Sequence, residues 1–219
     1  DTACGTGLVS FPAAEKVGRM GFVLATDISD GMVQLGEEFA REKNYTNISF
    51  ERMDAEELTV PDAEYDVATC ALGLMYVPDP VKALREMYRV IKPGGRAIVA
   101  VWGQRDRCGW AGVFEIVDKR VASEVCPMFF SLGTGDRLKL SFEVAGFSNV
   151  IIERIKTELI YHSDEEAYGA AFAGGPVALA YHKFSEQARN EAHLEYLDSI
   201  KSFKNDKGYA VPGEFVIAS

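Results

Sequence analysis

Positive charge is scarce in this sequence of 219 residues, where 23 lysines and arginines stand against 33 aspartates and glutamates. Nucleic acids and anionic membranes select basic surfaces, so the formal net charge of -10 argues against both as partners. The sequence has no apolar run of the roughly 18 to 20 residues that span a bilayer, and nothing in it resembles a signal peptide. We therefore expect neither nucleic-acid binding nor membrane insertion.

Cysteine pairs at functional spacings are also missing. The four cysteines, Cys4, Cys70, Cys108 and Cys126, include no CxxC pair and have no histidine at metal-ligand spacing. Zinc sites and disulfide frameworks depend on such spacings, so we predict no metal site and no disulfides. Free thiols are typical of a reducing compartment, which favours a cytoplasmic protein.

Alternating elements are what the first 102 residues do show: apolar runs flanked by turn residues alternate with stretches of helical periodicity. This alternation predicts an α/β fold with a doubly wound, mostly parallel sheet. We expect residues 1–102 to form a ligand-binding core. Its predicted elements are strands over 21–27, 48–52, 65–71 and 97–102, and helices from Ser29 onward and over 80–91.

The second half, residues 103–219, has a less regular pattern and is expected to complete the same domain with cap helices over a substrate. Its predicted elements are helices over 104–124 and 136–145, a long strand over 149–159, two or three more helices and a strand over 214–218. Pairing of the last strand with 149–159 gives the sheet an antiparallel edge hairpin, a common feature of mixed sheets.

Residues suited to binding a nucleoside follow three consecutive strands. The loop Asp1-x-Ala3-x-Gly5-x-Gly7 allows a tight turn and the close approach of a ligand. Asp27 ends the next strand 20 residues after Gly7, where its carboxylate can accept hydrogen bonds from both hydroxyls of a ribose. Asp54 follows the third strand and is placed to accept from an exocyclic adenine amine. The set suits an adenosine with a compact polar tail.

A nicotinamide cofactor is the first alternative, because dinucleotide enzymes use a similar glycine turn followed by an acid. The third glycine of that fingerprint is replaced by Ser10, and Pro12 falls in the helix that packs against the strand. These two residues weaken the dinucleotide interpretation.

Five motifs in order resemble those of class I S-adenosylmethionine-dependent methyltransferases, most closely the ubiquinone/menaquinone-biosynthesis-like (methyltransferase type 11) group. They are Asp1-Thr-Ala-Cys-Gly-Thr-Gly7, Ala25-Thr-Asp-Ile-Ser29, Met53-Asp-Ala-Glu-Glu-Leu58, Tyr65-Asp-Val67 and Arg89-Val-Ile-Lys-Pro-Gly-Gly95. The match covers about residues 1–102. Ala3 stands where the family most often has glycine.

This resemblance implies a seven-stranded Rossmann-like sheet whose first, central strand precedes Asp1 and is missing from this chain. It places Gly5 and Gly7 near the methionine part of S-adenosylmethionine, Asp27 on the ribose and Ile28 against the adenine. The full set of cofactor-binding residues that it implies is Asp1, Ala3, Gly5, Gly7, Asp27, Ile28, Asp54, Ala55, Cys70, Ala71 and Leu72.

The expected activity is methyl transfer to a small, partly apolar acceptor, with S-adenosylhomocysteine as product. Because the sulfonium is already activated, proximity and alignment can supply much of the rate, and a general base is optional. Tyr76, just after the fourth strand, is the best-placed catalytic candidate, ahead of His162, His182 and His193. Aromatic residues expected to line the acceptor pocket, together with Tyr76, are Trp102, Trp110, Phe129, Tyr168 and Phe172.

Three alternatives stay open beside this expectation. The chain can be a degenerate protein that binds S-adenosylmethionine without turnover, a nicotinamide-dependent oxidoreductase, or a nucleic-acid methyltransferase. A small-molecule substrate is the expected partner, and a homodimer is left open.

Overall fold

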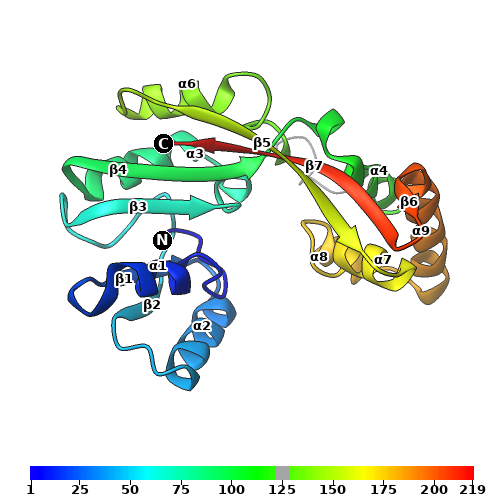
Figure 1. The fold of residues 1–219 in the computed structure, drawn as a ribbon, viewed down its shortest axis with the longest axis horizontal. Helices are drawn as coiled ribbons and strands as arrows, with labels where there is room; N and C mark the ends of the chain where they lie inside the picture. Colours follow the sequence, from blue (N-terminus) through cyan, green and yellow to red (C-terminus); the bar gives the residue numbers. More distant parts are fainter. Residues whose placement is uncertain (122–128) are drawn as a thin grey trace. The chain divides into compact units, whose positions relative to one another are not determined.

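The computed structural model describes residues 1–121 and 129–219 and divides the chain into two compact units. Unit 1 comprises Asp1–Val101, Asp136–Glu153 and Ile217–Ser219. Unit 2 comprises Trp102–Gly135 and Arg154–Val216. Each unit is described by itself below, with the element labels of Figure 1.

Unit 1 contains the regular alternation that the sequence predicts. Its elements in chain order are α1 Ser10–Val17, β1 Val23–Asp27, α2 Asp30–Glu42, β2 Ile48–Arg52, β3 Tyr65–Ala71, α3 Pro80–Val90, β4 Ile91–Trp102 and α6 Arg137–Ala145. The last residue of β4, Trp102, already belongs to unit 2. The helix starts follow the capping signals: Ser29 accepts from the N–H of Met32 before α2, and Asp79 accepts from the N–H of Lys82 before α3. Helices α3 and α6 pack against each other.

The strand pairs of unit 1 are parallel. β1 pairs with β2 from Val23↔Ile48 to Asp27↔Arg52, and β3 pairs with β4 up to Ala71↔Ala100. Thr2 forms a parallel bridge with Thr26, and its N–H donates to the carbonyl of Thr69 at 2.7 Å. The carboxyl ends of β1 and β3 therefore meet at the loop that follows Thr2, which is the edge where parallel sheets bind ligands.

In the described residues the strands form two sheets. One contains β1 and β2, and the other has the order β3, β4, β7 (Gly208–Ala218) and β5 (Ile152–Tyr161), with β6 (Lys204–Asn205) beside β7. The mixed α/β class is confirmed. The resemblance implies one seven-stranded sheet with a central strand before Asp1, whereas here the two sheets are linked through the backbone of Asp1 and Thr2. β1 and β3 are therefore each the edge strand of their own sheet.

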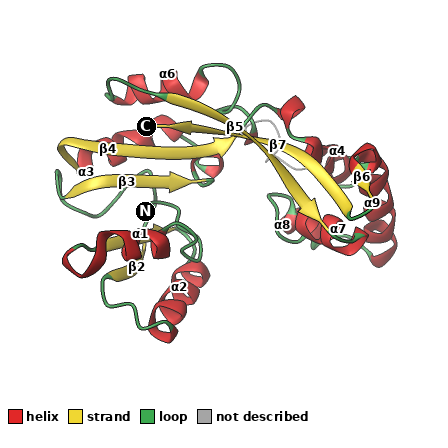
Figure 2. Cartoon of the chain, in the orientation of Figure 1, coloured by secondary structure: helices red, strands yellow, loops and turns green. Residues whose placement is uncertain are grey.

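Unit 2 combines helices with strand segments, as Figure 2 shows. Its helices are α4 Gly112–Asp118, α7 Asp164–Phe172, α8 Ala178–Tyr181 and α9 Glu186–Ser199. α9 packs against both α4 and α7. Among the residues that the structure describes, none of the helices is both long and apolar enough to cross a bilayer.

β5 (Ile152–Tyr161) and β7 (Gly208–Ala218) contribute residues to both units and are neighbours in the larger sheet. In unit 1, Ile151 and Ser219 exchange both backbone hydrogen bonds, at 2.8 and 3.0 Å, as antiparallel partners do. The predicted edge hairpin between these segments is confirmed. In unit 2, β6 (Lys204–Asn205) forms an antiparallel hairpin with the start of β7.

Two predicted elements differ from the structure. The helix expected over 104–124 is broken into two 3-10 turns, Arg105–Arg107 and Gly109–Ala111, and the short helix α4, because glycines interrupt the segment; residues 122–124 lie outside the described part. The strand predicted over 97–102 begins earlier, at Ile91. Residues 92–95 lie inside β4 as a bulge, since the register passes from Tyr65↔Ile91 to Val67↔Arg96, with Gly94 at φ +84°.

Candidate functional site

The loop after Thr2 uses backbone conformations that glycine supplies without strain. Gly5 and Gly7 have φ of +56° and +96°, and Ala3 adopts φ +51° despite its side chain. A Cβ on Gly7 would lie 2.7 Å from the ring of Phe11, so this glycine allows the loop to pack on α1. A Cβ on Gly5 would have no atom of the chain within 4 Å. Gly5 therefore presents bare backbone to open space, where a ligand can approach closely.

Asp27 is held in a fixed orientation at the end of β1. The N–H of Gly5 donates to Oδ2 at 2.9 Å, and the N–H of Ser29 donates to Oδ1 at 3.0 Å. A carboxylate has about four acceptor positions, so each oxygen keeps capacity for a further donor. Next to it Ile28 is 62% exposed, an apolar surface at the predicted position of the adenine.

Asp54 lies next along this edge. The N–H of Met53 donates to the carbonyl of Asp27 at 3.0 Å, which ties the segment after β2 to the end of β1. Asp54 is exposed, and its Oδ1 accepts from the N–H of Glu56 at 2.8 Å. Ala55 in the same turn is half-buried. The carboxylate is thus oriented locally through Oδ1 on an exposed residue.

The segment Cys70–Leu72 contacts the glycine loop through the residue that follows it. A Cβ on Gly73 would lie 2.4 Å from Cβ of Ala3, so a larger residue here would displace the loop. Gly73 was not among the residues predicted from the sequence; a glycine two residues after the predicted strand over 65–71 was the signal that could have found it. Leu72 has a left-handed φ of +58°, and Ala71 and Leu72 are half-buried.

The two cysteines of this region are not nucleophiles at neutral pH. Burial, with the Asp27 charge adding to it, raises the pKa of the Cys4 thiol to about 12. Burial raises the pKa of Cys70 to about 11. Both thiols therefore stay protonated at neutral pH. Cys108 is also buried and free, and Cys126 lies outside the described residues.

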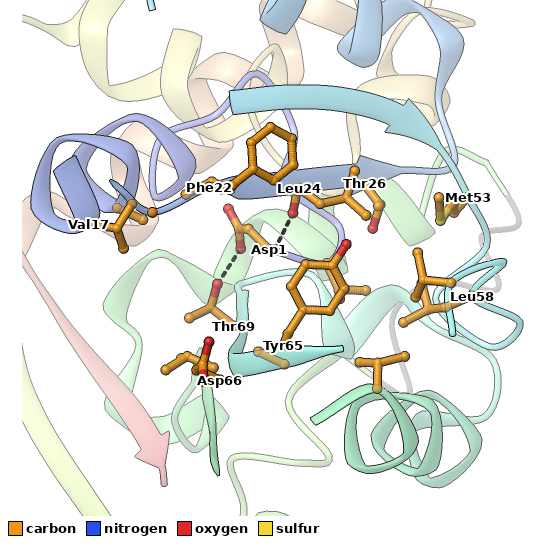
Figure 3. Close-up of a pocket in the computed structure, with 18 of the residues that line it drawn as sticks. Asp1, Val17, Phe22, Leu24, Thr26, Met53, Leu58, Tyr65, Asp66 and Thr69 are labelled. Atoms are coloured by element: carbon orange, nitrogen blue, oxygen red, sulfur yellow. Dashed lines mark hydrogen bonds between the residues drawn. The ribbon is translucent and has the colours of Figure 1, made fainter. Parts of the chain in front are cut away.

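Asp1 serves the interior of unit 1. Its carboxylate accepts from the hydroxyls of Thr69 at 2.9 Å and Ser10 at 2.5 Å, which joins β3 to α1. Its backbone nitrogen donates to the carbonyl of Leu24, and Figure 3 shows this bond and the one to Thr69. Beside it a cavity of about 310 Å³ separates β1 from β3. Its lining is mostly apolar and includes Phe22, Leu24, Met53, Leu58, Tyr65 and Val67. Of the predicted cofactor residues only Asp1 lines it, so the cavity is distinct from the loop edge.

The predicted acceptor-pocket aromatics of unit 2 form two clusters. Trp110 packs against Trp102 at 4.9 Å and Phe129 at 5.9 Å between ring centroids. Tyr168 stacks on His193 at 3.9 Å, and Phe172 lies 5.5 Å from the same imidazole. Trp110, Phe129 and Phe172 are buried, as core residues are. Their role as pocket residues stays a prediction.

Tyr76 belongs to unit 1 and ends the 3-10 turn Leu74–Tyr76. Its side chain is half exposed. Partial burial raises the pKa of its hydroxyl, so Tyr76 is protonated near neutral pH. Such a group is better suited to donating a hydrogen bond than to removing a proton.

Comparison with known proteins gives a consistent assignment. Residues 1–119 match the model of a methyltransferase domain family. Demethylmenaquinone methyltransferase of Listeria welshimeri is 40% identical over 114 residues, 52% of this chain and 48% of that protein. The Staphylococcus carnosus protein of the same name is 34% identical over 167 residues, covering 70% of this chain and 68% of its own length.

Among solved structures, the YcgJ protein from Bacillus subtilis superposes with a TM-score of 0.64 at 19% identity. The superposition covers 100% of this chain and 88% of that one, and it shows the likeness of fold. The chain spans about half the length of the Listeria relative.

Proposed function

The chain belongs to the methyltransferase domain family, and we propose that it transfers a methyl group from S-adenosylmethionine to a small-molecule acceptor. The observation that carries the proposal is the double anchoring of Asp27 by Gly5 and Ser29. It holds a carboxylate beside bare glycine backbone at the ligand edge of a parallel sheet.

The residues at this edge fit an adenosyl cofactor part by part. Asp27 accepts from the ribose hydroxyls, Ile28 covers one face of the adenine, and Asp54 accepts from the exocyclic amine. Gly5 leaves space for the methionine part, since even a methyl group would project into the open volume over its backbone. The cofactor supplies an activated methyl group when bound.

The protein's contribution to catalysis is alignment and exclusion of water, which together can supply much of the rate of such a transfer. Gly73 and Ala3 pack the glycine loop closely against the segment that follows β3, which favours a fixed backbone around the reacting centre. We assign Tyr76 the role of donating a hydrogen bond to the acceptor and not that of a base, because its pKa is raised.

For the acceptor we propose a quinone of the demethylmenaquinone type. The support is the names of the Listeria and Staphylococcus relatives, of which the second matches over 70% of this chain. The cytoplasmic location and the homodimer remain predictions from the sequence.

Calorimetric titration of S-adenosylhomocysteine tests the cofactor assignment. Removing the hydrogen bonds of a charged acceptor costs about 2 to 3 kcal/mol, so Asp27→Ala is expected to weaken binding roughly 30- to 150-fold. Asp30→Ala is the matched control, because Asp30 is exposed three residues away and pairs only with exposed Arg52 among the ion pairs of the described residues. No binding by the parent chain, or equal binding by Asp27→Ala, would refute the proposal.

Transfer of labelled methyl from S-adenosylmethionine to demethylmenaquinone tests the acceptor. Turnover supports the proposal, whereas binding of S-adenosylhomocysteine without turnover favours a degenerate cofactor-binding protein. Titration with NAD addresses the oxidoreductase alternative, to which the family match gives no support. Salt-dependent RNA binding would revive the nucleic-acid methyltransferase.

A further inference from the structure

The segment 54–62, which carries Asp54, is held in place by a single arginine of helix α3. Arg89 donates from Nη2 to the carbonyl of Leu58 at 2.7 Å and from Nη1 to the carbonyl of Val60 at 2.8 Å. Nη1 also donates to Asp62 at 2.7 Å. One guanidinium therefore binds three positions of a segment that contains neither a helix nor a strand.

Glu86 completes the clamp one helical turn earlier. It accepts from Nε and Nη2 of Arg89 at 2.9 and 2.7 Å, and from the N–H of Leu58 at 2.8 Å. The hydrogen bond from Arg89 holds the pKa of Glu86 below its ordinary value, so the pair is charged at neutral pH. Leu58 thus has both backbone groups bound by the ion pair, while its side chain is buried beside Leu24 and Val90.

The other end of the same helix fixes the turn at Asp54. Glu56 accepts from the N–H of Asp79 at 2.8 Å, at the start of α3. The N–H of Glu56 donates in turn to the carboxylate of Asp54 at 2.8 Å. Helix α3 therefore holds segment 54–62 at both ends, and the orientation of Asp54 depends on where the helix places this segment.

We propose that Arg89, with Glu86, is a positioning residue for base recognition. It holds segment 54–62 so that the exposed carboxylate of Asp54 meets the exocyclic amine of the cofactor's adenine. Only the planar fork of arginine can bind these acceptors at once, because the ammonium of lysine lacks that fixed geometry. The inference rests on the proposed function, since it assigns Asp54 to the adenine.

The test compares two ligands in calorimetric titrations of the whole chain. S-adenosylhomocysteine carries the exocyclic amine, and S-inosylhomocysteine has an oxygen in its place. Arg89→Lys keeps the charge but loses the fork; it is expected to weaken S-adenosylhomocysteine about tenfold and to change S-inosylhomocysteine by less than about twofold. Asp54→Ala should remove the same preference, and adding Arg89→Lys to it should cause little further loss.

Arg85→Lys is the matched control, since Arg85 is exposed on the same helix. It should change neither affinity. Glu86→Gln is a milder variant that keeps an acceptor for Leu58 and should shift the preference in the same direction by less. Unfolding midpoints of all variants identify any that fold poorly. If Arg89→Lys is one of them, the affinities of Glu86→Gln for the two ligands are compared with those of the parent chain.

The outcomes separate the two claims. Absence of S-adenosylhomocysteine binding by the parent chain overturns the proposed function and this inference with it. Binding by the parent with an unchanged base preference in both Arg89→Lys and Glu86→Gln overturns the inference alone. Equal weakening of both ligands also overturns it, because that result describes a general structural role.

Discussion

The two units place their polar groups differently. In unit 1, Asp27 and Asp54 lie at the ends of parallel strands, oriented by backbone N–H groups and open toward solvent on one side. In unit 2, Glu214 is 4% exposed and binds Arg154 at 3.0 Å, and the hydroxyl of Tyr196 is buried. The two acids of unit 1 therefore stay open to a ligand, whereas these groups of unit 2 are bound or enclosed in its interior.

This difference predicts that substitutions in the two units have different effects on cofactor affinity and on stability. Changes at the strand ends of unit 1 should alter cofactor affinity more than stability, and changes at the buried polar groups of unit 2 should do the reverse. Both tryptophans of the chain, Trp102 and Trp110, lie in unit 2, so their fluorescence reports the unfolding of that unit.

The largest effect is expected at the ion pair of unit 2 between Arg154, which is partly exposed, and the buried Glu214. Arg154→Met removes the bond to Glu214 and those to the carbonyls of Gly133 and Gly135, and it leaves Arg107, at 3.9 Å, as the ion-pair partner of Glu214 in the described residues. Because loss of a hydrogen bond to a charged group costs about 1.5 to 3 kcal/mol, the free energy of unfolding should fall by about 2 kcal/mol. Urea denaturation followed by tryptophan fluorescence measures it. A loss of S-adenosylhomocysteine affinity in the folded variant would break the division between the units.

A smaller effect of opposite sign is expected at Tyr196. Its side chain is fully buried and its hydroxyl has no hydrogen-bond partner among the described residues. Because a buried unsatisfied polar group costs free energy, Tyr196→Phe should raise the free energy of unfolding by about 1 kcal/mol. The same denaturation experiment measures it, with Tyr168→Phe as a half-buried control. Destabilisation by Tyr196→Phe would mean that the hydroxyl has a role that the interior of unit 2 does not explain.

The smallest effect is the pH dependence due to His193. Burial first, and the Arg189 charge second, lower its pKa below the ordinary value; Tyr168, Phe172 and the Tyr181 hydroxyl at 2.8 Å also surround it. The unfolded chain therefore takes up a proton near pH 6.5 before the folded protein does. Stability should be unaffected by this group above that pH and fall on acidification, by less than about 1 kcal/mol per pH unit.

Unfolding midpoints measured between pH 5 and 8 on parent and His193→Gln check this sign. The slope should be shallower in the variant. An equal slope in both proteins would show that another group carries the pH dependence of unit 2.

The elements of unit 1 could be predicted because they depend on local signals, such as the capping residue Ser29 and the glycines of the first loop. The hydrogen bond between Gly5 and Asp27 joins positions 22 residues apart, so only the structure shows it. Gly73 was missed because its role arises only from contact with Ala3, 70 residues earlier in the chain.

Unit 2 was harder to predict for a physical reason. The pairing of Arg154 with Glu214 and the stacking of Tyr168 on His193 join residues far apart in the sequence, with no periodic pattern to indicate them. Helical periodicity predicted a continuous helix over 104–124, which was wrong because glycines divide this segment after Trp102. The ends of elements in unit 2 follow from packing, which the sequence alone does not reveal.

Two glycines allow the most direct test of the difference between the units. Gly5 in unit 1 and Gly135 in unit 2 both have φ +56° and no atom within 4 Å of a built Cβ, so alanine should cost each unit about 1 kcal/mol of stability. We would titrate S-adenosylhomocysteine into Gly5→Ala and Gly135→Ala. The account predicts a loss of roughly tenfold or more for Gly5→Ala and parent affinity for Gly135→Ala. Equal affinities in the two variants would contradict the placement of the cofactor at the loop edge of unit 1.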